Sequence, residues 1–556
     1  MIRYVFIFPI VCFCSCLLAS GADSTSSRTL RVPVDYPSIQ AALDHAQAGD
    51  TVLVSAGAYH GHVQLKEGVC LRSEGDDSPG AQEHGGRRPL KRAEQTIIDV
   101  QGSTKGAVVA GAEGATLDGF TVTGLGHVNH HLPGHAHAVE CRNCSATIIN
   151  NIIRDNGSTG IGQHALKGAT EGRVAAPYVA NNFVFRNKGI GIGNNHRSQT
   201  VIVNNVVFEN HEAGIGARNE AAPLIEGNVV FNNGRGYKSL DPAECKKFDK
   251  DQWSLWPGIG IKDGARAIVR KNKVTGNALC GISVDNGAFA LIEENDVRDN
   301  QMPGIGIGGH RAATAVIRKN TVRGNRGPGI GVNIGSEAAI IENTVGPNGD
   351  GMPGIAVVDG STATVIANSI EPGPVAGIAV IGATATVSGN QIAGPQKTGI
   401  RVDDSVTTLD NNHITRAGAV GMMLNNSRVT VTRNTINGSA HHGILIAGKE
   451  CRASVAANIL EDNAGSGGAH IFLAKESACR VAANEFRGKA RLGDVFRSKT
   501  DAPATSADKP TEMIKKFRMD PAILGPGPTE NYFKTGKPDH THKASDHDHD
   551  ATPPRK

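Results

Sequence analysis

The sequence has few aromatic residues and no long apolar stretch after its first two dozen residues. Aromatics make up 4% of the 556 residues, and only two are tryptophans. This scarcity argues against a large globular enzyme with a thick aromatic core, and the lack of an internal 20-residue apolar run argues against a membrane-spanning protein. Hydrophobic residues still reach 39%, too many for a disordered chain. The composition therefore indicates an ordered but thin structure.

An excess of either charge is also lacking. Lys and Arg number 57 and Asp and Glu 53, giving a formal net charge of +4 with no basic stripe. We therefore expect no nucleic-acid partner. Glycine, in contrast, is abundant: the chain has 69, about 12%, against a usual ~7%.

The two ends of the chain differ from the middle. Residues 1–22 are typical of a secretory signal, with Arg3, an apolar run and then small residues; a lipoprotein acylated at Cys16 is an alternative. We expect an extracytoplasmic protein (secreted, periplasmic or on the cell surface), without a membrane span once mature, and monomeric. Residues 497–556 have low complexity and predict a disordered tail.

Seven of the ten cysteines follow the expected signal, an odd number. Similar flanking sequences favour one disulfide, and a second is a looser expectation: Cys451 with Cys479, and Cys245 with Cys280. Cys141 and Cys144 form a CxxC motif in a strand and turn context, which leaves open a structural pair or two free thiols.

An asparagine recurs mostly every 22 to 25 residues, and a Gly followed by an apolar residue comes about nine positions after it. A second asparagine follows five places after the first in eight repeats. The first series is Asn151, Asn182, Asn205, Asn228, Asn272, Asn295, Asn320, Asn343, Asn368, Asn390, Asn412, Asn434, Asn458 and Asn484. The intervening runs alternate apolar and polar residues over a few positions, which predicts about three short strands per repeat. Stacked coils would align the asparagines in a ladder around a narrow aliphatic core.

The repeat and the opening segment from Val34 to Val69, with its phrases Tyr-Pro-Ser-Ile-Gln-Ala-Ala and Gly-Asp-Thr-Val-Leu-Val, resemble the pectate-lyase-like superfamily. The resemblance implies an all-β, right-handed, single-stranded parallel β-helix over residues 30–490, with an insertion at 234–257. It also implies a short N-terminal capping helix from Ile39 to Gln47, for which Ser38 is the N-cap. The fold hosts many activities, so function must come from the site.

Glycines form a strip on one outer face of the expected solenoid. If the Ile of each Gly-Ile pair points inward, the next residue points outward. That position is occupied by Gly162, Gly193, Gly216, Gly260, Ser283, Gly306 and Gly331. Glycine is unfavourable in strands, so the strip indicates either a groove for an extended polymer or a surface covered by a loop.

The flanks of the strip carry aromatic and polar residues. Trp253 and Trp256, in the insertion, are expected to stack on sugar rings. Glu220, His310 and Arg311, with Gly193, Gly216 and Gly260 as the floor, complete the expected binding set. We therefore expect a protein that binds, and cleaves or epimerises, an acidic polysaccharide; the alternatives are a non-catalytic surface solenoid and an extracytoplasmic protein that handles copper.

Six residues are the candidate catalytic groups: His196, Arg197, Arg218, Lys262, Asp263 and Asp285. A lyase or epimerase needs a base and a cation near a uronate carboxylate, which suits a histidine or lysine beside arginine. The two aspartates, on adjacent repeats, also suit a glycosidase pair, a Ca²⁺ site with Glu220, or plain turn residues. The hydrolase signatures associated with the superfamily are missing, which disfavours a hydrolase.

A histidine-rich segment precedes the first asparagine repeats. Its members are His127, His130, His131, His135 and His137. Such density suits a transition metal, and some β-helix proteins similar to this one assist copper-enzyme maturation. The spacing follows no defined metal motif, so a polar loop beside the strip is the alternative interpretation.

Overall fold

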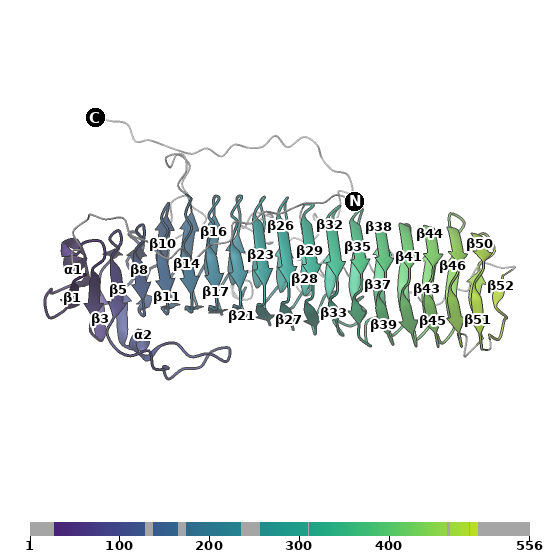
Figure 1. The fold of residues 1–556 in the computed structure, drawn as a ribbon, viewed down its shortest axis with the longest axis horizontal. Coiled ribbons are helices and arrows are strands. Elements are labelled where there is room, and N and C mark those ends of the chain that lie inside the picture. Colours follow the sequence, from purple (N-terminus) through teal and green to yellow (C-terminus); the bar gives the residue numbers. More distant parts are fainter. Residues whose placement is uncertain are drawn as a thin grey trace, which may run out of the picture.

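The computed structural model describes residues 27–127, 137–164, 174–234, 256–309, 311–463, 467–488 and 490–498. The chain winds into a long stack of coils, from β1 (Thr29–Val32) to β52 (Val495–Arg497) (Figure 1). Within the described residues, each full coil adds one strand to each of three parallel sheets, which have 18, 17 and 17 strands. This arrangement confirms the predicted parallel β-helix.

We name the sheets A, B and C in the order in which a coil visits them. One coil consists of β23 (Arg266–Arg270) in sheet A, β24 (Lys273–Thr275) in sheet B and β25 (Ile282–Val284) in sheet C. The other strands of sheet C that follow in the text are β10 (Val139–Arg142), β13 (Ile161–His164), β16 (Ile192–Asn195), β19 (Ile215–Ala217), β22 (Ile259–Ile261), β28 (Ile305–Ile307), β31 (Ile330–Val332), β34 (Ile355–Val358), β37 (Ala376–Ile381), β40 (Thr398–Asp403), β43 (Val420–Asn425), β46 (His442–Ala447) and β49 (Ile471–Leu473).

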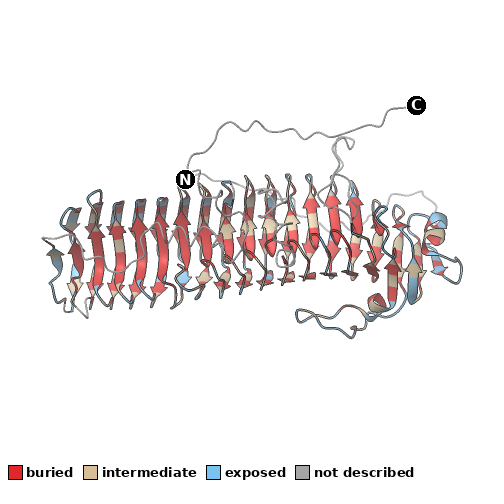
Figure 2. Cartoon of the chain, turned by 180° about the vertical axis from the view of Figure 1, so that it is seen from behind, coloured by how far each residue is buried: buried red, intermediate tan, exposed pale blue. Residues whose placement is uncertain are grey.

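Small aliphatic side chains fill the interior because the strands stack in register. Ile215, Ile259 and Ile282 are direct partners on successive coils, and each is fully buried. Figure 2 shows such buried residues along the whole stack. One continuous apolar cluster extends through the described chain with Phe120 as its only fully buried aromatic member. A core of this width has little room for rings, which accounts for the low aromatic content.

The predicted asparagine ladder lies at the turn between sheets A and B. In each step, the backbone N–H and the side-chain Nδ2 of one asparagine donate to Oδ1 of the next; for Asn272 and Asn295 both distances are 3.0 Å. The residue in the left-handed conformation is the one before the ladder, such as Lys271 (φ 54°). The asparagine is therefore selected because its amide satisfies buried backbone groups, rather than for its tolerance of left-handed geometry. The second ladder is also present, with Asn277 donating to Asn300.

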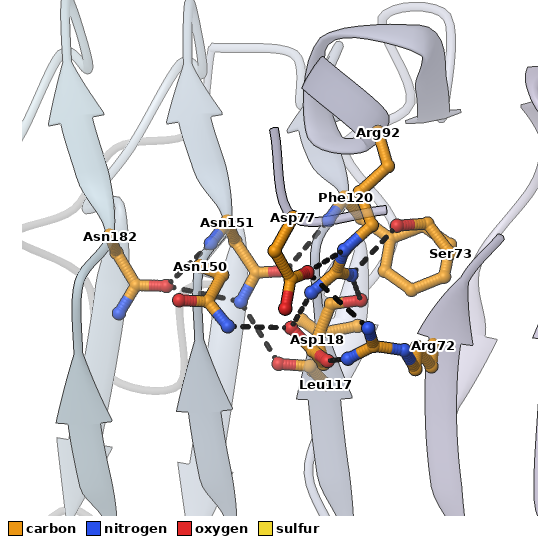
Figure 3. Close-up of polar contacts among 10 residues, drawn as sticks. All are labelled: Arg72, Ser73, Asp77, Arg92, Leu117, Asp118, Phe120, Asn150, Asn151 and Asn182. Atoms are coloured by element: carbon orange, nitrogen blue, oxygen red, sulfur yellow. Dashed lines mark hydrogen bonds and ion pairs between the residues drawn. The ribbon is translucent and has the colours of Figure 1, made fainter. Parts of the chain in front are cut away.

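An arginine terminates the first ladder at its N-terminal end (Figure 3). Arg92, on α2 (Lys91–Gln95), is almost completely buried and donates to Asp118 Oδ1 at 2.7 Å and to Asp77 Oδ1 at 2.8 Å. Its guanidinium occupies the space that a Cβ on Gly119 would need. The coil before Asn151 therefore uses a buried ion-pair network where later coils use an amide.

Two N-terminal segments pack on the solenoid. Helix α1 spans Ile39–His45, and the Ser38 hydroxyl accepts the Ala41 N–H at 3.2 Å, as an N-cap does. Residues 74–90 form an arm along sheet B (Figure 1), in which the ring of His84 lies 4.7 Å from that of Phe208. The arm covers an outward column of phenylalanines that the sequence analysis did not anticipate.

Candidate functional site

The glycine strip is in register on the outer face of sheet C. Gly162, Gly193, Gly216 and Gly260 are direct partners on successive strands, and Ser283, Gly306 and Gly331 continue the column. The flanking isoleucines point inward. The strip predicted from the repeat is therefore a real surface feature.

Local packing requires glycine at only some positions of the strip. A Cβ at Gly162 would collide with the His137 ring, and one at Gly260 would lie 2.9 Å from Pro257. At Gly193 the nearest atom to such a Cβ is the Thr159 methyl at 3.6 Å, an ordinary contact. Gly193, Gly216 and Gly260 remain half-exposed, whereas Gly162 is buried. The strip is thus partly open, and at Gly193 its bareness has no packing cause.

Two cations stand beside the open part of the strip. Arg218 and Lys262 occupy the next outward position after the glycine, two residues along, on adjacent coils about 4.8 Å apart along the stack. Lys262 Nζ lies 3.4 Å from Asp263 Oδ2. Within the described residues, the Arg218 guanidinium has no hydrogen bond or ion pair. This position therefore presents a half-exposed positive charge next to bare backbone.

Two turns at the edge of sheet C have a left-handed backbone without glycine. His196 and Arg197 have φ values of 46° and 62°, and Asn219 and Glu220 have 52° and 62°. Later turns place glycine second, as in Asp263-Gly264. A non-glycine residue costs roughly 1 kcal/mol there.

These two turns bring the predicted polar residues together. Arg197 Nε donates to Glu220 Oε2 at 2.8 Å, with both side chains exposed. Asn219 Nδ2 donates to Asn195 Oδ1 at 2.7 Å and lies 3.5 Å from His196 Nε2. Asn195 and Asn219, which the sequence places on the polar flank of the strip but which are not among the predicted catalytic or binding residues, belong to this cluster because they extend it over two coils.

The two candidate carboxylates are offset by one position instead of facing each other. The register places Asp285 opposite Lys262 and Asp263 opposite Asn286, whose Nδ2 donates to it. Asp285 is buried, and its Oδ1 accepts the backbone N–H groups of Asn286, Gly309 and Arg311 at 2.7–3.1 Å. Asp285 therefore organises a turn.

Other predicted binding residues lie apart from this cluster or outside the described residues. Trp256 is only 8% exposed, so the interpretation of its ring as an open stacking platform is wrong. Arg311 is exposed, and its backbone N–H is bonded to Asp285. Trp253 and His310 lie outside the described residues.

The histidine segment is described only at its two ends. His127 is exposed, and His137 is buried with Nε2 4.0 Å from Glu140 Oε1; His130, His131 and His135 lie outside the described residues. Arg142 Nη2 is 2.8 Å from the same Glu140 oxygen. Glu140 is the direct partner of Gly162 and therefore begins the glycine column. The sequence analysis did not place Glu140 in this column. The described parts of the chain hold no group of three potential metal ligands.

The expected disulfide between Cys451 and Cys479 is absent, because both thiols are free. The register pairs Cys479 with Ala453 instead, and burial raises the pKa of Cys479 to about 11. Cys280 is also free, with a pKa raised to about 12 by burial, and it lies beside Gly306. Its expected partner, Cys245, lies outside the described residues.

Between successive ladder positions, three coils are longer than the others, and their extra residues join the ends of sheet C strands. Successive ladder positions are separated by 31, 31 and 44 residues at these coils, against 22 to 26 elsewhere. The extra residues precede β10, follow β13 and precede β22. These three long connections adjoin β10, β13 and β22, whereas the coil from β5 (Cys70–Ser73) to β8 (Thr116–Asp118) is lengthened between sheets A and B by the arm.

Comparisons with known proteins agree with the coil architecture. A right-handed β-helix region matches residues 246–345 and 353–502, and a family of unknown function, DUF1565, matches 19–236. No curated protein matches the sequence. The longest helices of the described residues are too short to cross a membrane.

Several solved structures are similar at low identity. The A-module of mannuronan C-5 epimerase AlgE4 from Azotobacter vinelandii is 16% identical, over 70% of this chain and 92% of that one, with a TM-score of 0.40. The periplasmic alginate epimerase AlgG is 11% identical over 62% and 77%, with a TM-score of 0.34. The catalytic unit of an α-1,3-glucanase from Streptomyces thermodiastaticus is 13% identical over 88% and 72%, with a TM-score of 0.30. With its continuous coils and the β-helix match, the chain is an all-β protein that folds as a right-handed parallel β-helix.

Proposed function

We propose that this protein binds an extended acidic polysaccharide on the outer face of sheet C, across the coils of Gly193, Gly216 and Gly260. The observation that supports this most directly is Gly193: the fold leaves room there for a side chain, yet none is present. A flat ligand that contacts the strand backbone would explain the bare surface.

The charges beside the strip favour an anionic polymer. Arg218 can donate two parallel hydrogen bonds to a carboxylate, and Lys262 supplies a second cation one coil away. The exposed Arg197–Glu220 pair and the Asn219 amide would reach hydroxyl groups of the same chain. The repeat of the coils would match a linear polymer better than a compact ligand.

A reaction on the bound polymer is a second part of the proposal. His196 lies on the strained turn next to Asn219 and on the coil beside Arg218. A lyase or epimerase requires a base at the carbon next to the carboxylate and a cation on that carboxylate. His196 and Arg218 are the pair that we assign to these roles. An extracellular polymer also suits the expected secretory signal.

The test compares two double variants of equal charge change. Arg218→Ala/Lys262→Ala removes the two cations beside the strip, and Arg266→Ala/Lys273→Ala removes two exposed cations on sheets A and B. Binding of polygalacturonate, alginate and the neutral polymer dextran is measured by titration calorimetry. We expect binding of a polyuronate but not dextran, and a loss of about tenfold or more only in the first variant, since a charged hydrogen bond contributes ~1.5–3 kcal/mol. Absence of polyuronate binding, or equal binding by both variants, would contradict the proposal.

A further inference from the structure

Cys141 and Cys144 converge inside the coil that heads the glycine strip. Cys141 lies on β10 and points into the core, and Cys144 follows the left-handed residue Asn143 (φ 51°), where the chain bends. The two sulfur atoms lie 3.0 and 3.2 Å from one point, the place of a Cβ on Gly111. The Cys141 thiol donates a hydrogen bond to Cys144. The two sulfurs therefore lie close together on the inner side of the bend.

The two thiols are not equivalent. The hydrogen bond from Cys141 lowers the pKa of Cys144, and the same bond together with burial raises the pKa of Cys141. Cys144 is 5% exposed and Cys141 is fully buried. Burial raises the pKa of the other cysteines that the structure describes, namely Cys70, Cys280, Cys451 and Cys479. Since the thiolate is the nucleophile, Cys144 is the attacking thiol of this pair and Cys141 the resolving one.

We propose that Cys141 and Cys144 form a redox-modified site, in which the two thiols are oxidised to a disulfide by exchange with a small-molecule disulfide. The Cys144 thiolate attacks one sulfur of the reagent, whose S–S bond breaks and releases one thiol with a proton. Cys141 then loses its proton and attacks Cys144 Sγ, so the internal S–S bond forms and the second small thiol leaves. Two protein thiols are oxidised and one reagent disulfide is reduced to two thiols.

The bond would lock the coil at the end of the strip. Cys141 lies between Glu140 and Arg142, whose side chains point to the outer face of the same strand and form an ion pair there. A disulfide to Cys144 fixes the bend that follows β10. This proposal is independent of the proposed polysaccharide binding, because it concerns the inner face of the strand.

The experiment uses the full chain, reduced and then incubated with oxidised glutathione, followed by alkylation and peptide mass spectrometry. We expect an internal Cys141–Cys144 bond in the wild type. Cys141→Ser should instead retain glutathione on Cys144, because the resolving thiol is missing, and Cys144→Ser should leave Cys141 as an unmodified thiol.

The matched control is Cys479→Ser, which should leave the Cys141–Cys144 bond unchanged. Circular dichroism checks that each variant is folded. If a variant does not fold, the proposal is tested by the disulfide mapping of the oxidised wild type alone. Recovery of both Cys141 and Cys144 as free thiols in the oxidised wild type would overturn the proposal. A bond between Cys451 and Cys479 in their place would do the same.

Discussion

The outer face of sheet C changes character along the solenoid while its inner face stays the same. From β16 to β28 the outward column is mostly half-exposed glycine beside polar residues. From β34 onward the same column becomes Ala356, Ala379, Arg401, Met423 and Leu445, which are buried except for the half-buried Met423. The inward residues are branched or long aliphatics in both regions. The interior therefore specifies the fold, and the outward column distinguishes one region from the other.

The ion pairs of the two regions also differ in burial. Arg401 Nε lies 2.5 Å from Asp403 Oδ2 on the outer face of β40, with both side chains buried. Burial raises the pKa of Asp403 even though Arg401 lowers it. The Arg197–Glu220 pair at the glycine strip is exposed. An ion pair that is buried is costly to break from one side, whereas an exposed pair contributes little.

Removing the arginine of each ion pair should destabilise the two regions to very different extents. Arg401→Ala leaves the buried Asp403 carboxylate without its arginine and should reduce the free energy of unfolding by about 3 kcal/mol. Arg197→Ala should cost less than about 1 kcal/mol, because its pair is exposed. Urea unfolding followed by circular dichroism measures both. Equal losses would show that the two regions do not differ in solvation.

Ladder substitutions should affect both regions alike. Asn295→Ala and Asn434→Ala each remove an amide that bonds to the asparagine of the next coil. Each leaves buried backbone groups unsatisfied, so we expect a loss of about 2 kcal/mol in both. The same urea titration provides the measurement. A clearly smaller loss for one variant would mean that the interior is not uniform.

Larger side chains at the outward position of sheet C should have different effects in the two regions. Ala379→Leu inserts a large side chain at a buried outward position and should cost about 1–3 kcal/mol. Gly193→Leu should change stability by less than about 0.5 kcal/mol, because that surface is partly open. It should nevertheless abolish polyuronate binding, and Thr386→Leu, at an exposed position of sheet A, serves as the control. If Gly193→Leu binds a polyuronate as strongly as the wild type, the glycine strip is not the binding surface.

A further prediction concerns the pH dependence of stability in the buried region. Burial lowers the pKa of His442 from 6.5 to about 4, so the unfolded chain binds its proton more readily than the folded chain. The stability associated with neutral His442 is complete above about pH 6.5 and falls as the pH decreases towards 4. His442→Asn should flatten the melting temperature across this window. An unchanged slope would contradict the assignment.

The fold, both ladders and the register of the glycine strip could be predicted because each depends on the spacing of asparagine and glycine residues that recurs along the sequence. The offset of Asp263 and Asp285 follows from the same register, because Asp263 is three positions after Gly260 and Asp285 is two positions after Ser283. The hydrogen bonds by which Asp285 organises its turn could not be predicted, because they come from loop backbone on the next coil. The outward phenylalanines were missed because the arm that covers them, with His84, is distant in sequence. The Cys451 and Cys479 expectation failed because similar flanking residues do not guarantee equal register.

Hydrogen exchange with and without a polyuronate shows whether the polymer binds the glycine strip, because it reports separately on the two regions of sheet C. Binding on the glycine strip should slow amide exchange in β16, β19 and β22 and leave β37, β40 and β43 unchanged. Slower exchange in the second group alone, or no change in either group at saturating polymer, would contradict the account.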